Sequence, residues 1–300
     1  MFKNIIMYRI GPDWAPSQAE VDAGLDALRF VPCGAHEEKS VGWVEPRGEA
    51  HGPLVEVVGS QLIFKLKLET KVVPGAVVTR KAKERAAHIE ATTGRKPGKK
   101  ETREIKDDIR LSLMPMAFSK EATVWVWVDA QARLLVLDAG SQAKADEVVT
   151  LLVKSLHGLN LSLINTQVSP MAAMADWLLT QEAPGGFTVD RDCELKAADE
   201  SKSVVRYARH ALDTDEVKQH VQNGKLPTRL ALTWAGRVSF MLTEGMQLKK
   251  LDFLDVVFDD SGNSNPKDEG FEADVAIATG ELRKLLPDLL EALGGEQALA

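Results

Sequence analysis

Gln61-Leu-Ile-Phe-Lys-Leu-Lys-Leu68 is the stretch of the 300-residue sequence that decides the fold. In its second half, apolar residues alternate with Lys65 and Lys67. Successive side chains of a β-strand point to opposite faces of the sheet, so this alternation predicts a half-buried strand with a basic outer face. Pro74 then ends the strand pattern.

The segment that follows, residues 75–113, has the pattern of a helical hairpin. The first helix is predicted over residues 77–91 and the second over residues 100–113. Between them Thr92-Thr-Gly-Arg-Lys-Pro-Gly98 contains the Gly and Pro residues that interrupt helices. Both helices are poor in large apolar residues and can bury little surface, so we expect the hairpin to project from the body as an arm.

Charge is unevenly distributed along the chain. The net charge is −7, with 37 Lys and Arg against 44 Asp and Glu. Residues 65–110 nevertheless hold 14 Lys and Arg against 7 Asp and Glu, which leaves 23 basic and 37 acidic residues elsewhere. Such a local excess can mark a nucleic-acid surface even on an acidic protein, although many charged helices are merely solvated.

Outside the arm, strand-like and helix-like segments mix without a fixed repeat. The pattern predicts the α+β class: antiparallel sheets with flanking helices and a projecting helical-hairpin arm. We expect three regions: a central α+β region formed by residues 1–74 and 114–170, the basic arm of residues 75–113, and a C-terminal α+β region of residues 171–300.

The end of the chain has its own predicted pattern. Residues 259–270 are polar and acidic, which indicates a loop. A strand is predicted over residues 271–279, and a closing helix over residues 280–294.

Several classes of protein are disfavoured. The sequence contains no GxxxxGK[ST], GxSxG or HExxH motif and no dinucleotide fingerprint. Cys33 and Cys193 stand alone, which argues against a disulfide framework or a zinc site and favours a reduced, cytoplasmic compartment. No signal peptide is recognisable, and no apolar run is long enough to cross a membrane. We therefore expect no cofactor and no membrane partner.

Carboxylates leave one enzymatic alternative open. Asp107-Asp108, Asp259-Asp260 and residues 269–274 could contribute to a metal site of a nuclease. Adjacent residues on a helix diverge by about 100°, which disfavours the first pair as a joint ligand set. The sequence favours a protein that is not an enzyme.

Phosphates are the expected ligands of the arm, because Lys and Arg bind them through charge and counterion release whatever the base sequence. No aromatic residue occurs between Phe64 and Phe118, whereas a single-strand binder needs aromatic stacking platforms. The arm is therefore predicted to contact double-stranded DNA without sequence preference. The predicted contacts are Lys71, Arg80, Lys81, Lys83, Arg85, Arg95, Lys96, Lys99, Lys100, Arg103 and Lys106.

Phe118 follows the arm within Met114-Pro-Met-Ala-Phe-Ser119. An aromatic residue among methionines at an element boundary can make an intermolecular contact. From composition alone, the simpler interpretation is that Phe118 fills the core where the arm joins the body.

The chain resembles the RdgC family of recombination-associated proteins nearly from end to end. The segments that carry the resemblance are Phe2-Lys-Asn4, Tyr8-Arg9, Phe30-Val-Pro-Cys-Gly34, Gly42-Trp-Val44, Lys71-Val-Val-Pro74, Leu113-Met-Pro-Met-Ala-Phe-Ser119, Lys154-Ser-Leu156, Leu230-Ala-Leu-Thr-Trp234, Leu248-Lys-Lys-Leu251, Phe271-Glu-Ala-Asp274, Thr279-Gly-Glu-Leu282 and Leu293-Gly-Gly-Glu296. Within residues 75–113 only the basic, helical character matches.

The resemblance implies a horseshoe-shaped subunit that pairs at both ends into a ring-shaped homodimer encircling duplex DNA. It also implies association with the nucleoid and restraint of RecA-dependent recombination, without catalysis. A two-fold ring needs two self-complementary contacts per subunit. Phe118 matches the family position at one contact, while Arg209 and His210 match the other, where the family pattern has Lys and Gln. His210 would make that contact depend on pH.

A third class of function also fits the sequence. The acidic surface of the body could contact the RecA filament directly, so that inhibition would not need DNA binding. The sequence leaves this protein-interaction module open as an alternative.

Overall fold

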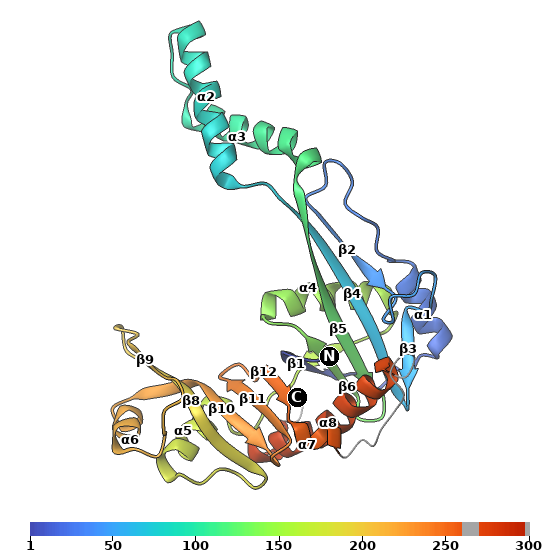
Figure 1. Cartoon of the computed structure of the whole chain (residues 1–300), viewed down its shortest axis with the longest axis vertical. Coiled ribbons are helices and arrows are strands. Elements are labelled where there is room, and N and C mark those ends of the chain that lie inside the picture. The colour runs from blue at the N-terminus through green and yellow to red at the C-terminus, as the bar shows by residue number, and fades with distance from the viewer. Residues whose placement is uncertain (260–269, 298–300) are drawn as a thin grey trace.

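The computed structural model describes residues 1–259 and 270–297 and shows an α+β protein built on one large antiparallel sheet. Every pairing between neighbouring strands is antiparallel, in the order β2-β4-β5-β6-β1-β12-β11-β10-β8-β9, with β3 beside β4 and β7 beside β1 (Figure 1). The strands are β1 Ile5–Ile10, β2 Lys39–Val44, β3 Val55–Val58, β4 Gln61–Val72, β5 Phe118–Asp129, β6 Leu134–Asp138, β7 Leu161–Leu163, β8 Phe187–Ala197, β9 Val204–Tyr207, β10 Lys225–Trp234, β11 Val238–Thr243 and β12 Leu248–Phe253. The prediction of the α+β class is confirmed.

Eight α-helices lie within the described residues. They are α1 Gln18–Asp26, α2 Gly75–Thr93, α3 Lys99–Leu113, α4 Gln142–Ser155, α5 Pro170–Thr180, α6 Asp215–Gln222, α7 Asp255–Asp259 and α8 Gly270–Ala292. Ser17 begins α1 with a capping box, in which its hydroxyl accepts from the Glu20 N–H while the Glu20 carboxylate accepts from the Ser17 N–H. Both helices predicted between residues 75 and 113 form close to their predicted bounds.

The predicted alternation in β4 is confirmed. Phe64 and Leu66 are fully buried, and β4 pairs with β5 without a break from Gln61↔Asp129 to Val72↔Phe118. The face with the lysines is less open than predicted. The Lys65 ammonium lies 4.6 Å from the centre of the Trp125 ring, and burial lowers the pKa of Lys65.

Helices cover the two faces of the sheet unequally. On one face, α1 and α4 bury Leu25 and Leu152 against Phe64 and Leu66 of the N-terminal strands. On the opposite face, α5, α6 and α8 form a second core, which extends from Trp127 in β5 to Leu230 in β10, Leu285 and beyond. A fully buried side chain of this size contributes roughly 1.5–3 kcal/mol, so these two cores are the main source of stability.

The middle of the sheet is a seam with little hydrogen bonding. β1 and β12 share one register pair, Ile5↔Leu248. Helix α8 spans this seam: Arg283 Nε lies 2.8 Å from Asp129 Oδ2 in the N-terminal half, and Glu281 accepts from Arg237 Nε at 2.7 Å in the C-terminal half. The helix therefore braces two halves that the sheet alone would join weakly.

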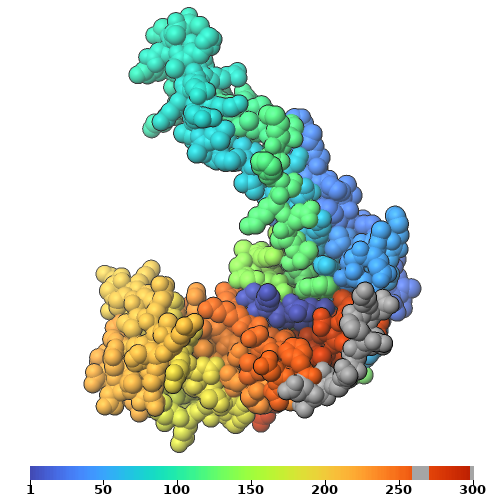
Figure 2. All heavy atoms as spheres, in the orientation of Figure 1, coloured from blue at the N-terminus to red at the C-terminus, as the bar shows by residue number. Residues whose placement is uncertain are grey.

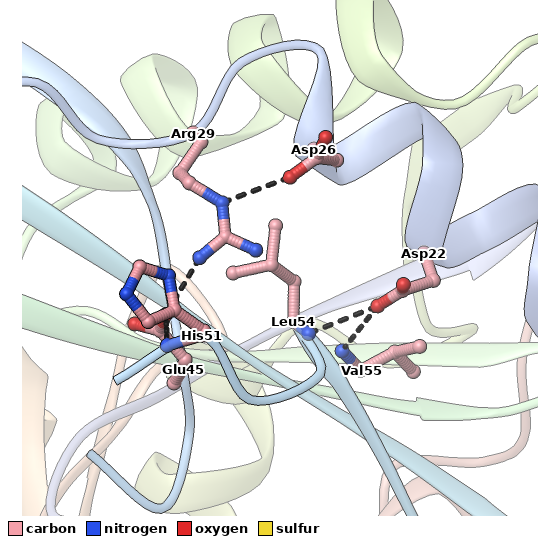
Figure 3. A network of polar contacts seen from close by, with 7 residues as sticks. All are labelled: Asp22, Asp26, Arg29, Glu45, His51, Leu54 and Val55. Carbon is pink, nitrogen blue, oxygen red and sulfur yellow. Dashed lines mark hydrogen bonds and ion pairs between the residues drawn. The ribbon is translucent and has the colours of Figure 1, made fainter. Parts of the chain in front are cut away.

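A polar network fixes α1 to the segment between β2 and β3 (Figure 3). Asp22 accepts from the Leu54 N–H at 2.9 Å, and Arg29 bridges Asp26 at 2.8 Å and Glu45 at 2.6 Å (Figure 3). Exposed ion pairs of this kind contribute about 0.2–1 kcal/mol each. Because these groups bind one another, the network is a structural feature and not a ligand site.

The helices α2 and α3 lie beyond the ends of β4 and β5, away from the rest of the chain, and α3 crosses α2 (Figure 1). We call residues 75–113 the tip. Its core is small, with Val78, Ala82, Ile105 and Ile109 as the buried side chains. The whole subunit is curved, with the tip at one end and β9 with α6 at the other (Figure 2).

The predicted strand over residues 271–279 is wrong. Residues 270–292 form the single helix α8, which buries Val275, Ala278, Leu282 and Leu285 on one side. A short apolar run does not distinguish a strand from a buried helix, and the spacing of three and four residues becomes visible only when the run is extended past Gly280. Most of the acidic loop predicted over residues 259–270 lies outside the described residues.

Candidate nucleic-acid interface

The predicted DNA contacts of the tip are exposed. This holds for Arg80, Lys81, Lys83, Arg85, Arg95, Lys96, Lys99, Lys100, Arg103 and Lys106. Lys71, the remaining predicted contact, is half-buried in β4, and its ammonium donates to the carbonyl oxygens of Gly34 at 2.6 Å and Ala35 at 3.1 Å. The structure therefore separates Lys71 from the others, since its donors already bind the loop beside β2.

Some of the tip cations are neutralised locally. Arg95 makes two hydrogen bonds to the Glu101 carboxylate, at 2.8 and 3.4 Å, and these lower the pKa of Glu101. Lys96 lies 3.7 Å from Glu90, and Arg80 pairs with the acid one turn further along α2 at 3.9 Å. These side chains are solvent-exposed, so salt or a competing phosphate can replace such pairs at little cost.

Four of the five cations of α3 form a stripe. Lys99, Arg103, Lys106 and Arg110 are spaced by four, three and four residues, which places them on one flank of the helix. They are exposed, and none has an ion-pair partner within 4 Å among the residues that the structure describes. From Lys99 to Arg110, 12 residues, the stripe is about 16 Å long. We call these four residues the α3 stripe.

Three of the four acidic residues of α3 lie on a different side of the helix. Helix geometry puts Glu101, Glu104 and Asp108 opposite the stripe, whereas Asp107 lies beside it, one turn from Arg103. Ile105 and Ile109 face α2. The helix is thus divided into a buried, a basic and an acidic side. The basic and acidic residues of α3 nearly cancel in its net charge. A count of charges therefore underestimates the positive electrostatic potential on the basic side.

Arg110 is the member of the stripe that the predicted set of contacts omitted. The signal was present in the sequence, as a cation at each of positions i, i+4, i+7 and i+11. On α2, the same spacing joins Lys81, Arg85 and His88 in a shorter exposed row.

Phe118 is 89% exposed, so the interpretation that it fills the core is wrong. It is the first residue of β5, at a point where the β4–β5 pair extends past the helices that cover the sheet. Its register partner Val72 and nearby Met116 are also exposed, at 47% and 75%. Residues directly opposite in an antiparallel pair point to the same face, so Phe118 and Val72 form one apolar patch.

Arg209 and His210 lie just beyond β9, at the other end of the curved subunit (Figure 1). Strand β9 ends at Tyr207, and Arg209 has a left-handed backbone with φ of 54°. Its N–H donates to Asp192 at 2.7 Å, and the His210 N–H donates to the Arg191 carbonyl at 3.0 Å. Both residues are exposed, but the His210 ring lies 5.3 Å from the Tyr207 ring and its Nδ1 lies 2.6 Å from the Ala211 carbonyl oxygen. Arg209 lines a surface groove of about 540 Å³.

The carboxylates proposed for a nuclease site are only partly described. Asp107 and Asp108 are exposed on α3. Asp260 and Glu269 lie outside the described residues. Within residues 1–259 and 270–297, no group of three or more His, Cys, Asp or Glu side chains is placed to hold a metal ion.

The two cysteines show no sign of activation. Burial raises the pKa of the Cys193 thiol to about 12, so it is protonated at neutral pH and a poor nucleophile. Burial also raises the pKa of Cys33. In the described part of the chain, no helix is long and apolar enough to cross a membrane.

These features define a class of protein: an α+β protein with a continuous antiparallel sheet that carries a basic helical tip at one end. The chain belongs to the RdgC family. Residues 1–296 match the family model described as "Putative exonuclease, RdgC". The resemblance found in the sequence is thereby confirmed.

Relatives support the same assignment across the whole chain. A protein of Dechloromonas aromatica is 46% identical over 299 residues, covering 98% of both chains. Proteins of Herminiimonas arsenicoxydans and Bordetella pertussis are 44% and 42% identical over 298 residues, covering 99% of each chain. All three are named "Recombination-associated protein RdgC".

Proposed function

We propose that this protein binds double-stranded DNA without sequence preference and acts as a symmetric dimer whose subunits close a ring around the duplex. The α3 stripe is the observation that carries the proposal. Four exposed cations without ion-pair partners among the described residues follow one flank of a projecting helix. A side of fixed positive charge fits a polyanion with evenly spaced phosphates.

The form of the stripe favours backbone contact over base readout. Duplex DNA carries one phosphate per about 3.4 Å of each strand, so about 16 Å of helix can follow several successive phosphates. The tip contains no aromatic side chain that could stack on an unpaired base. These properties support duplex over single-stranded DNA.

The proposed ring uses both ends of the subunit. The apolar patch of Phe118 and Val72 would dock on the partner at the tip, because burying exposed apolar surface lowers the free energy. Arg209 and His210 would make the second contact beyond β9. A two-fold axis brings the same residues of both subunits to each contact.

Restraint of RecA-dependent recombination follows as a physical consequence of the ring. A closed ring on duplex DNA would occupy the substrate of strand exchange without reading its sequence. The names of the relatives connect the family to recombination. We extend the proposal to a nucleoid-associated protein of the cytoplasm that is not an enzyme.

The direct test is a salt-titrated comparison of linear duplex, closed circular duplex and single-stranded DNA. We expect tight, sequence-independent binding to linear duplex, slower loading on closed circles and weaker binding to single strands. Loss of two stripe cations in Arg103→Gln plus Lys106→Gln should reduce the slope of log K against log salt by about 1.8. Arg133→Gln plus Lys218→Gln is the control, since it removes the same charge from the β5–β6 turn and from α6.

Two outcomes would overturn the proposal. Equal weakening by the control pair would mean that net charge, and not the stripe, drives binding. A monomer at micromolar concentration in sedimentation would contradict the ring. RecA inhibition that survives the loss of DNA binding would favour the protein-interaction module.

The description of the family model favours an exonuclease as the second candidate function. Incubation of the pure protein with linear plasmid and Mg²⁺ or Mn²⁺ distinguishes the two functions. Progressive shortening from the ends would replace the non-enzymatic proposal, whereas intact DNA after prolonged incubation supports it.

A further inference from the structure

A surface groove lies between helix α1 and the end of helix α4. Residues 13–16 form one wall, α1 contributes Val21 and Ala23, and residues 155–158 close the other side. The volume of about 570 Å³ is within the range of sites that bind small ligands. We call this feature the α1 groove.

The walls of the α1 groove differ in how firmly they are held. A Cβ atom at Gly24 would lie 2.3 Å from the Ser155 carbonyl oxygen, so only glycine lets α1 approach the end of α4 this closely. The loop before α1 has a weaker hydrogen bond, because the Trp14 backbone nitrogen lies 3.5 Å from the Gly11 carbonyl oxygen. The loop is therefore the wall that can adjust to a ligand.

Trp14 brings an unsatisfied hydrogen-bond donor to this groove. The residue lines the groove and is 9% exposed, and its indole N–H has no acceptor in the described part of the chain. In contrast, Trp127 and Trp234 donate their indole N–H groups at 2.7 and 2.8 Å. A buried indole N–H usually has a partner, and leaving it without one costs free energy. An acceptor that reaches Trp14 from the groove would remove this cost.

The rim of the groove is acidic. Asp13 and Glu20 line it and are exposed, and neither makes an ion pair with a residue that the structure describes. The Glu20 carboxylate accepts from the Ser17 N–H at 2.8 Å, which lowers the pKa of Glu20. The carbonyl end of α4 adds partial negative charge. His157 is the remaining ionisable side chain of the groove, so negative charge predominates.

We propose that the α1 groove binds a short basic segment of a partner protein, with the Trp14 indole N–H donating to a backbone carbonyl of that segment. Lys or Arg side chains of the segment would pair with Asp13 and Glu20, and its apolar side chains would pack on Val21 and Leu156. The indole nitrogen is buried, so the loop before α1 shifts to admit the carbonyl oxygen.

This groove is distinct from the proposed DNA contacts. Its acidic rim repels phosphates, whereas the cations of the tip attract them. Helix α1 lies on the opposite side of β4 from the space between the tip and β9 (Figure 1). A segment bound along α1 therefore need not displace DNA held at the tip, and the inference does not depend on the proposed function.

NMR spectroscopy of the indole N–H groups in the unmodified full chain tests the donor directly. The probe is a pool of capped tetrapeptides with Lys or Arg at both ends and Leu or Pro between them. The chain has six tryptophans, and the Trp14 signal is the one that Trp14→Phe removes. We expect the pool to move this signal downfield, as hydrogen bonding does. The signals of Trp127 and Trp234 should stay in place, because these indoles already have acceptors.

Two variants separate the donor from the rim in titrations with the same pool. Trp14→Phe keeps an aromatic ring without the N–H and should weaken binding about three- to tenfold, the effect of one lost hydrogen bond. Asp13→Asn should weaken binding about two- to fivefold, as for an exposed ion pair, and tests the rim even if Trp14→Phe is unstable. Asp176→Asn is the matched control on the exposed side of α5 and should bind like the unmodified protein.

Several results would overturn the inference. A Trp14 signal that the basic pool does not move would assign the donor to ordered water. An equal shift with a matched pool that has Asp or Glu at both ends, or equal weakening by Asp13→Asn and Asp176→Asn, would exclude the acidic rim from recognition. Movement of the Trp14 signal by 40-base-pair duplex would assign the groove to DNA. Trp14→Phe should bind duplex like the unmodified protein, so failure of this inference leaves the proposed function intact.

Discussion

The tip and the body differ in how many apolar side chains they bury. The body buries two extensive cores on opposite faces of a twelve-stranded sheet, whereas the tip buries four side chains between two helices. The tip exposes 11 Lys and Arg side chains, and the α3 stripe is exposed along its whole length. The difference shows that the body provides the stability, and it fits our proposal that the tip is a surface for a ligand.

The largest expected effect separates the body from the tip. Trp127 is fully buried in β5 and donates its indole N–H to Gln61 Oε1 at 2.7 Å. Trp127→Ala should lower the free energy of unfolding by about 3–5 kcal/mol, because it leaves a cavity and an unpaired amide. Urea denaturation followed by circular dichroism measures this loss, and a change below about 1 kcal/mol would mean that the body tolerates a void at its centre.

A smaller and local loss is expected in the tip. Ile105→Ala removes one of the four buried side chains and should cost about 2 kcal/mol, at the low end for such a truncation because little surrounds it. Hydrogen exchange should accelerate in α2 and α3 while the amides of β5 keep their protection. Equal acceleration in both regions would contradict the independence of tip and body.

The apolar patch beside the tip should matter for assembly and not for the fold. Phe118→Ser removes a side chain that is 89% exposed, so the melting temperature of the monomer should stay within about 2 °C. If the patch is covered in the dimer, its loss should weaken dimerisation by about 10- to 100-fold, which corresponds to 1.4–2.7 kcal/mol. Sedimentation at several concentrations measures this change; a dimer unaffected by the substitution would remove Phe118 from the interface.

The smallest effect concerns pH and again contrasts the two regions. The hydrogen bond from Arg237 lowers the pKa of Glu281, which is buried in the body. A carboxylate with a lowered pKa in the folded state stabilises above its ordinary pKa, and this stability is lost as the pH falls through the lower folded value. Stability should therefore decline below about pH 4.3, and Glu281→Gln should flatten that decline.

The tip provides the comparison for that measurement. Glu101 also has a lowered pKa, caused by the hydrogen bond from Arg95, but this pair is solvent-exposed. Glu101→Gln should leave the acid dependence of global unfolding unchanged, because salt and water screen an exposed pair. A larger effect from Glu101 than from Glu281 would contradict this order.

Local patterns predicted a large part of the fold. The alternation in residues 61–68 predicted the strand β4, and Gly-Pro punctuation predicted two helices between residues 75 and 113. The prediction of a strand over residues 271–279 failed because these nine residues belong to the 23-residue helix α8, whose buried residues follow a helical period. A short apolar run covers too few residues to distinguish the period of a helix from that of a strand.

The candidate site was predicted less completely. The cations of the tip are visible from charge alone, and the spacing of Lys99, Arg103, Lys106 and Arg110 could have been read as a stripe. The groove lined by Lys196, Arg229 and Lys249 could not have been predicted from the sequence. These residues come from three strands, and only the strand register brings them together. Lys71 was included for its charge, yet its ammonium is bound to loop carbonyls.

The sequence by itself determined the α+β class, the basic character of the tip and membership of the RdgC family, because these depend on residue types in local order. Tertiary structure alone decided that Phe118 is exposed, that α8 braces the seam at Ile5 and Leu248, and that three distant cations share one groove. Periodicity fixes which side of an element a residue occupies. What covers that side depends on packing between segments far apart in the chain, and only the folded protein determines it.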